Sequence, residues 1–230
     1  MKYDSYALKG RIAPTFFSII IPIMVFNHFY VSEEFSKFVG DFFAAKLISN
    51  LTISGICLYY LSEAARFIGK NVFESAYFKD EHYMPTTNFM LFNDPTYSDQ
   101  HKNKIRLKIT DDFGVSLPTR QDESLNEGSA RVRIVEVMAI IRKKLHGNEF
   151  LLQHNIEYGA MRNAIGGAVI GAALSSLGVV FFSYYMVIDL AMYINIFTLG
   201  VYLFMIIFSK IIIEFYGKNY AKILYREYLD

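Results

Sequence analysis

The sequence predicts an all-α membrane protein: four transmembrane helices, a mainly α cytoplasmic cap between the second and third of them, and a cytoplasmic C-terminal helical extension. Three observations predict this class. Hydrophobic residues make up 53% of the 230 residues, and aromatic residues make up 17%. They are concentrated in runs about as long as a bilayer is thick. Basic residues flank these runs on one predicted side of the membrane, and acidic residues on the other.

The first two predicted spans are residues 12–31 and 42–61. A helix that crosses a bilayer needs roughly 20 mostly apolar residues, and both runs have this length. Pro14 is in the first turn of the first run, where its missing N–H costs little. Pro22 is in the middle of that run, so we expect it to kink the helix.

The third and fourth predicted spans are residues 164–188 and 190–209, joined by a tight turn around Asp189. These runs do not alternate apolar and polar positions, which favours helices over barrel strands. Four runs of this length would leave a soluble protein too little polar surface. The predicted organisation is therefore two spans in 1–61, the cytoplasmic cap in 62–163, two spans in 164–209 and a cytoplasmic tail helix in 210–230.

The basic residues around the spans predict the orientation. The loop between the first two spans carries Glu33, Glu34 and Asp41 against one lysine, and the Asp189 turn has no basic residue. Both termini and the cap are therefore predicted to be cytoplasmic. The basic flanks on that side are Lys2, Lys9, Arg11, Arg66, Lys70, Arg162, Lys210, Lys218, Lys222 and Arg226.

Three segments of the cap have recognisable patterns. The second span is predicted to continue as a helix through residues 64–78. Residues 102–110 alternate basic and apolar side chains, which indicates a strand with one basic face, with a short helix as the alternative. Residues 129–145 indicate an amphipathic helix, with Gly147 as a C-cap. Its expected inward residues are Val132, Val135, Met138, Ala139 and Ile141.

The sequence carries no enzyme motif. It has no phosphate-binding glycine loop, no HExxH, no paired cysteines and no serine elbow, and its histidines are not at metal-ligand spacing. We therefore expect no enzymatic activity, no cofactor and no bound metal. The formal net charge of +1 gives no overall preference for nucleic acid or anionic surfaces, so any such preference must be local.

Small residues line one face of the third span, namely Gly167, Gly171, Ser175 and Gly178. Small residues let helices approach closely in a bilayer. Two interpretations have equal weight: packing within one subunit, or an oligomer seam or pore wall.

Polar residues lie in two of the predicted spans. Lys46 and Asn50 share a face of the second span, and Asn195, Thr198 and Tyr202 form a milder stripe in the fourth. A cation in hydrocarbon is costly, and Lys46 is close enough to the outer end to snorkel to the interface. Asn50 lies deeper, so we expect it to face protein or water. Such stripes could line a wet path between subunits.

The tail helix combines basic residues with Tyr216, Tyr220, Tyr225 and Tyr228. The favoured interpretation is a positive-inside collar against anionic lipid headgroups. The alternative is a polyanion site in which the basic residues neutralise phosphates and the tyrosines stack on bases.

Three short motifs carry a resemblance. They are YALKGRI (6–12) before the first span, MPTTNFML (84–91) in the cap and NIEYGAMRN (155–163) before the third span. They resemble a family of bacterial four-span membrane effectors encoded beside nucleotidyltransferase-like genes in anti-phage defence loci, such as the Hailong membrane channel effector. The resemblance implies an oligomeric ion channel of the inner membrane, whose opening kills or arrests the infected cell.

The same resemblance implies a ligand. In the family, a single-stranded DNA oligomer made by the partner enzyme holds the channel closed at a basic mouth. Carried onto this sequence by position at the membrane edge, not by a matched binding motif, the candidate residues are Lys9, Arg11, Arg162, Lys210, Lys218, Lys222 and Arg226.

The leading hypothesis is a homo-oligomeric channel gated through the cap. Four spans in one subunit are too few to enclose an aqueous path, so we expect self-association, with a tetramer as the expected state. The alternative is a membrane scaffold or sensor that docks a cytosolic partner and conducts nothing. A small transporter is disfavoured, because the sequence shows no inverted repeat.

Overall fold

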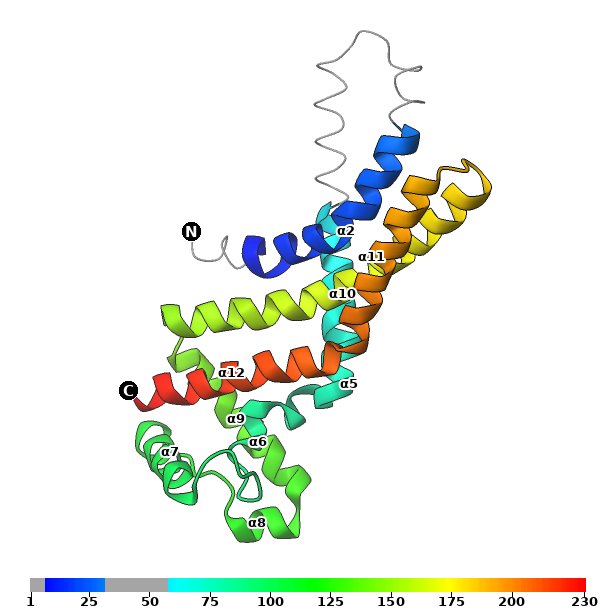
Figure 1. Ribbon diagram of the computed structural model, residues 1–230. Helices are drawn as coiled ribbons and strands as arrows, with labels where there is room; N and C mark the ends of the chain where they lie inside the picture. The colour runs from blue at the N-terminus through cyan, green and yellow to red at the C-terminus, as the bar shows by residue number, and fades with distance from the viewer. Residues whose placement is uncertain (1–6, 32–57) are drawn as a thin grey trace. The chain divides into compact units, whose positions relative to one another are not determined.

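The computed structural model describes residues 7–31 and 58–230, and every regular element among them is helical (Figure 1). The all-α class is therefore confirmed for these residues. Three helical stretches are long and apolar enough to cross a membrane: Leu8–Tyr30, Glu149–Tyr184 and Asp189–Ile207. They correspond to the first, third and fourth predicted spans. The predicted second span, 42–61, lies almost entirely outside the described residues and remains a prediction.

The chain divides into two compact units. The first, which we call the span unit, comprises residues 1–73 and 159–210. The second, which we call the cap unit, comprises residues 74–158 and 211–230. From Ile211 onward the tail helix therefore belongs to the cap unit, although the sequence predicted the tail helix and the cap as separate segments.

The first span is one continuous helical run. It consists of a π-helical turn η1 (Leu8–Ile12), α2 (Ala13–Phe26) and a second π-helical turn η2 (Asn27–Val31). Pro22 lies inside α2 and has no N–H to give to the carbonyl of Ser18, one turn earlier. The run changes direction within α2 (Figure 1), as expected of a helix with an internal proline.

The helix that enters the cap unit is confirmed. Residues 58–67 are α-helical and continue through a π-helical segment η3 (Ile68–Glu74) into α5 (Ser75–Phe78). Lys79 ends this run with a left-handed φ of 43°. A 3-10 turn, η4 (Asp80–Tyr83), and the proline-initiated α6 (Pro85–Asn88) follow.

The turn between the last two spans is placed differently from the prediction. α10 (Glu149–Tyr184) ends four residues before the predicted end at Ile188, and the turn occupies 185–188, with Val187 at a φ of 50°. Asp189 is instead the first residue of α11 (Asp189–Ile207). A carboxylate there is stabilised by the positive end of the helix dipole, which is why an aspartate starts the helix.

The core of the cap unit is built from α6, α7 (Asp99–Phe113), α9 (Glu127–Lys144) and α12 (Ser209–Leu229). A short helix, α8 (Arg120–Leu125), is capped by a reciprocal pair of hydrogen bonds between Thr119 and Asp122. The buried residues at the centre of this core include Met90, Ile105, Ile109, Ile134, Met138, Ile141, Leu224 and Tyr225.

The strand-like interpretation of 102–110 is wrong, and the helical alternative is correct. Lys102, Ile105 and Ile109 are the buried residues of α7, a spacing that belongs to one helical face. The Lys102 ammonium donates to the carbonyl oxygens of Leu91 and Asp94, each at 2.5 Å. Burial lowers the pKa of Lys102, against the opposing effect of nearby carboxylates. The alternation was misleading because Leu107 is 65% exposed and Lys102 is buried, so apolar and basic residues do not separate onto two faces of α7.

The predicted inward face of α9 is partly wrong. Met138 and Ile141 are buried, but Val132 and Ala139 are exposed. The buried face of α9 is rotated from the predicted one because it includes Arg131 instead of Val132 and Ala139. The Arg131 guanidinium donates to the His82 carbonyl at 2.8 Å. The C-cap of α9 is Leu145, so the prediction of Gly147 as the C-cap is wrong; Gly147 lies two residues further on, with a φ of 97°.

Asp112 ties three helices of the cap unit together, which gives a pH-dependent prediction. Its carboxylate lies 2.6 Å from the Lys144 ammonium and accepts a hydrogen bond from the Tyr228 hydroxyl at 2.8 Å. These two hydrogen bonds lower the pKa of Asp112 below its usual 3.8. Near pH 3.8 the unfolded chain therefore binds more protons than the folded one, and Asp112 stabilises the fold above that pH.

We expect Asp112→Asn to lower the thermal midpoint of the cap unit at pH 7. The difference from the wild type should shrink as the pH falls below 3.8 and the native carboxylate is protonated. Circular dichroism melts between pH 3 and pH 7 test this, with the exposed Asp111→Asn as a charge-matched control. A difference that stays constant over the whole range would show that the carboxylate charge is not what Asp112 contributes.

Candidate membrane-embedded site

The small-residue face of α10 packs against helices of the same chain. Gly167, Gly171, Ser175 and Gly178 are all buried. A Cβ at Gly171 would lie 2.5 Å from the Ser18 carbonyl oxygen on α2 and 2.8 Å from the Tyr202 ring on α11. A Cβ at Gly178 would lie 2.5 Å from Asn195 Oδ1. The two glycines therefore allow α2 and α11 to approach α10 closely.

Hydrogen bonds connect α10 to both of these helices. The Ser18 hydroxyl lies 2.8 Å from the Pro14 carbonyl oxygen and 3.2 Å from that of Ala164. Ser175 Oγ lies 3.0 Å from Thr198 Oγ1. Because the Thr198 hydroxyl donates to the Asn195 carbonyl at 3.1 Å, Ser175 is the donor of this pair.

We call these polar residues within the span unit the polar seam: Ser18, Ser175, Asn195, Thr198 and Tyr202. Each is buried, and the least exposed, Ser175, is at 0%. The seam combines the small-residue face predicted on the third span with the polar stripe predicted on the fourth. Ser18 was not predicted to belong with them. The available signal was its position one turn before an intramembrane proline.

Two atoms of the polar seam have no hydrogen-bond partner within residues 7–31 and 58–230, namely Asn195 Oδ1 and the Tyr202 hydroxyl. Asn195 is 1% exposed and Tyr202 is 4% exposed. The Asn195 amide nitrogen, in contrast, donates to the Ala191 carbonyl at 2.9 Å. A polar group left without a partner in hydrocarbon costs roughly several kcal/mol, so these two atoms are the unsatisfied part of the polar seam among the described residues.

The predicted cationic site is divided between the two units. Lys9, Arg11, Arg162 and Lys210 belong to the span unit, and Lys218, Lys222 and Arg226 belong to the cap unit.

In the span unit, Lys9 and Lys210 are exposed, and Arg11 lies 3.6 Å from Glu63. Arg162 is only 9% exposed, so it is a packing residue rather than an open cationic site.

In the cap unit, Lys218, Lys222 and Arg226 are exposed along one face of α12. Glu214 lies 3.8 Å from Lys218, and the Arg226 guanidinium lies over the Phe150 ring at 4.7 Å. This row is basic but partly neutralised.

The tyrosines of α12 do not alternate with that row on the surface. Tyr225 is 0% exposed and Tyr228 is 2% exposed. The predicted role of these two in stacking on bases is therefore wrong. The signal for burial was present: Ala221, Leu224 and Tyr228 recur at helical spacing on the face opposite Lys222.

Two further predicted residues, Lys46 and Asn50, lie outside the described residues. Among the residues that are described, no group of three or more histidine, cysteine, aspartate and glutamate side chains is placed to hold a metal ion. Comparisons with protein families, with curated proteins and with solved structures found no match to this chain.

Proposed function

We propose that this protein is a homo-oligomeric ion channel of a bacterial inner membrane, gated through the cap unit, and that it acts as an anti-phage effector. The observation that carries the channel proposal is the polar seam. Spans that serve only as anchors do not need five buried polar side chains, two of which have an atom without a hydrogen-bond partner in the part of the chain that the structure describes. Intramembrane polar residues characteristically mark water-filled or ion-conducting paths.

Hydration of the polar seam would account for its two unpartnered atoms. Water beside Asn195 Oδ1 and the Tyr202 hydroxyl would supply the hydrogen bonds that these atoms lack among the described residues. The resemblance to four-span effectors supports the defence role and the single-stranded DNA ligand. The exposed row on α12 supplies cations for that ligand in the cap unit.

Ion flux through proteoliposomes tests the channel, with two adjacent serines of α10 as the matched pair. Ser175 contacts Thr198, whereas the neighbouring Ser176 is exposed and donates to the Ala172 carbonyl of its own helix. We expect Ser175→Ala and Thr198→Val to reduce the flux several-fold, because each removes a hydroxyl from the polar seam. Ser176→Ala should leave it unchanged.

Equal flux in all three variants would show that the polar seam is not part of the conducting path. Liposomes that stay tight under every condition would favour the second candidate, a scaffold that docks a cytosolic partner. The α12 row is the observation that favours a docking role. Suppression of the flux by added single-stranded DNA would support the proposal that such DNA is the ligand. Flux that does not change on its addition would contradict the ligand proposal but not the channel proposal.

A further inference from the structure

A groove of about 400 Å³ lies in the span unit between α2, α10 and α11. Its walls are mainly apolar and include Phe17 of α2, Ala164 of α10 and Phe197 of α11. The volume falls within the range of about 300 to 1,000 Å³ that is typical of small-molecule sites. It is therefore large enough to hold a ligand rather than a few waters.

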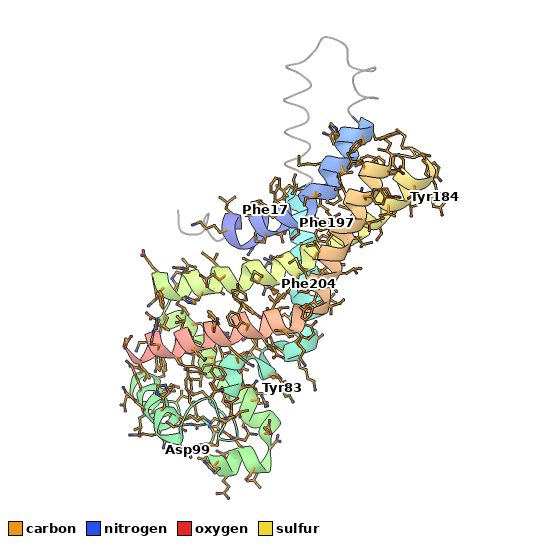
Figure 2. All side chains as sticks on the ribbon, viewed as in Figure 1. Phe17, Tyr83, Asp99, Tyr184, Phe197 and Phe204 are labelled. Carbon is orange, nitrogen blue, oxygen red and sulfur yellow. The ribbon has the colours of Figure 1, made fainter. Side chains whose placement is uncertain are left out.

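The rim of the groove is apolar and open. Phe17 is 70% exposed and Phe197 is 72% exposed, and Figure 2 shows them on α2 and α11. Because both residues lie in helices of membrane-spanning length, their exposed rings face lipid tails rather than water. The molecules available at this opening are therefore the lipids of the bilayer.

Among the polar residues in the groove wall, one has an unsatisfied group. The hydroxyls of Ser18 and Thr198 are both engaged with backbone carbonyls. The Tyr202 hydroxyl has no partner within the described ranges, although Tyr202 is 4% exposed. The hydroxyl itself is buried, so the groove presents mainly apolar walls, and an occupant that fits it is mostly apolar, as the acyl chain of a phospholipid is.

Basic residues precede the groove in the sequence. Pro14 lines it, and Arg11 and Lys9 come three and five residues before Pro14 on the same helical run. Glu63 lies 3.6 Å from Arg11 and offsets part of its charge, while Lys9 is exposed. This end of the first span is the one that the basic flanks predict to be cytoplasmic, where basic sites between spans bind anionic headgroups.

We propose that the groove is a binding site for an anionic phospholipid of the cytoplasmic leaflet. One acyl chain occupies the space between Phe17, Ala164 and Phe197, and the phosphate lies against Lys9. The proposal does not depend on whether the protein conducts ions.

The acyl-chain half is tested with phosphatidylglycerol that carries a photoreactive diazirine on its acyl chain, in phosphatidylcholine vesicles. We expect adducts to concentrate on the groove residues. Val201→Trp, a lipid-exposed change that fills the groove, should reduce these adducts at least several-fold. Val180→Trp is the matched control, because Val180 is also lipid-exposed, at 51%, and is not a groove residue.

The headgroup half is tested by titrating phosphatidylglycerol and phosphatidylcholine separately and measuring binding by native mass spectrometry. Lys9→Gln should weaken phosphatidylglycerol binding about fivefold and leave phosphatidylcholine binding unchanged. Lys70→Gln, another exposed lysine of the span unit, should change neither. Adducts spread evenly over the three helices would overturn the proposal.

Discussion

Replacing Gly166 by alanine is expected to disrupt the packing of the span unit, at a cost of about 1 to 3 kcal/mol or more. A Cβ at this position would lie 1.9 Å from the Ala65 carbonyl oxygen and 2.8 Å from the Gly69 nitrogen. Both are backbone atoms, so no side-chain rotation relieves the overlap. The contact is reciprocal, because a Cβ at Gly69 would lie 2.4 Å from the Arg162 carbonyl oxygen.

Gly200→Ala is the matched control, since a Cβ at Gly200 on α11 would meet nothing within 4 Å. The measurement is the temperature at which detergent-solubilised protein loses its monodisperse peak in size-exclusion chromatography. Gly166→Ala should lower this temperature strongly, and Gly200→Ala should hardly move it. Equal behaviour of the two variants would contradict the close helix contact at Gly166.

Tyr225→Ala is expected to unfold the cap unit or to cost about 3 to 5 kcal/mol, the usual range for removing a buried aromatic side chain. Tyr225 is 0% exposed, and its hydroxyl donates to the Thr86 carbonyl. Its ring meets the Tyr97 ring edge-on at 5.9 Å. Burial raises the pKa of Tyr97 to about 12 and that of Tyr225 well above 10, so both phenols stay protonated and uncharged in the core.

The control for this variant is Lys222→Ala, which removes an exposed side chain one turn earlier on α12. Urea titrations of the solubilised protein, followed by limited proteolysis of α9 and α12, compare the two. A loss of protection confined to Tyr225→Ala is the expected result. Similar protection in both variants would show that α12 does not belong to the core of the cap unit.

The spans could be predicted from the sequence more accurately than the fold of the cap. A run of apolar residues at spanning length has few alternatives, and the predicted bounds of the third span missed its end by one turn. In α7 the local pattern misled, because Lys102 is buried. Its burial depends on the carbonyls of Leu91 and Asp94, which no local periodicity reveals. Arg131 had the same effect on the predicted face of α9.

The candidate site was only half visible in the sequence. Helical spacing placed Gly167, Gly171 and Gly178 on one face, because that depends on a single helix. Which helices would cover this face is a tertiary question, and the answer includes Ser18, which the pattern did not mark. The cationic candidates were chosen by residue type and position along the sequence. Arg162 is buried, and its burial depends on neighbouring helices that the sequence does not reveal.

The two parts of the cap unit are delivered at different times during synthesis. Residues 74–158 leave the ribosome first, and 211–230 follow only after the third and fourth spans. Until then, the surface that will hold Leu224 and Tyr225 stays uncovered, and closing so long a loop slows folding. Completion of the cap therefore requires residues 211–230 to return to 74–158 after the residues of the third and fourth spans have been synthesised.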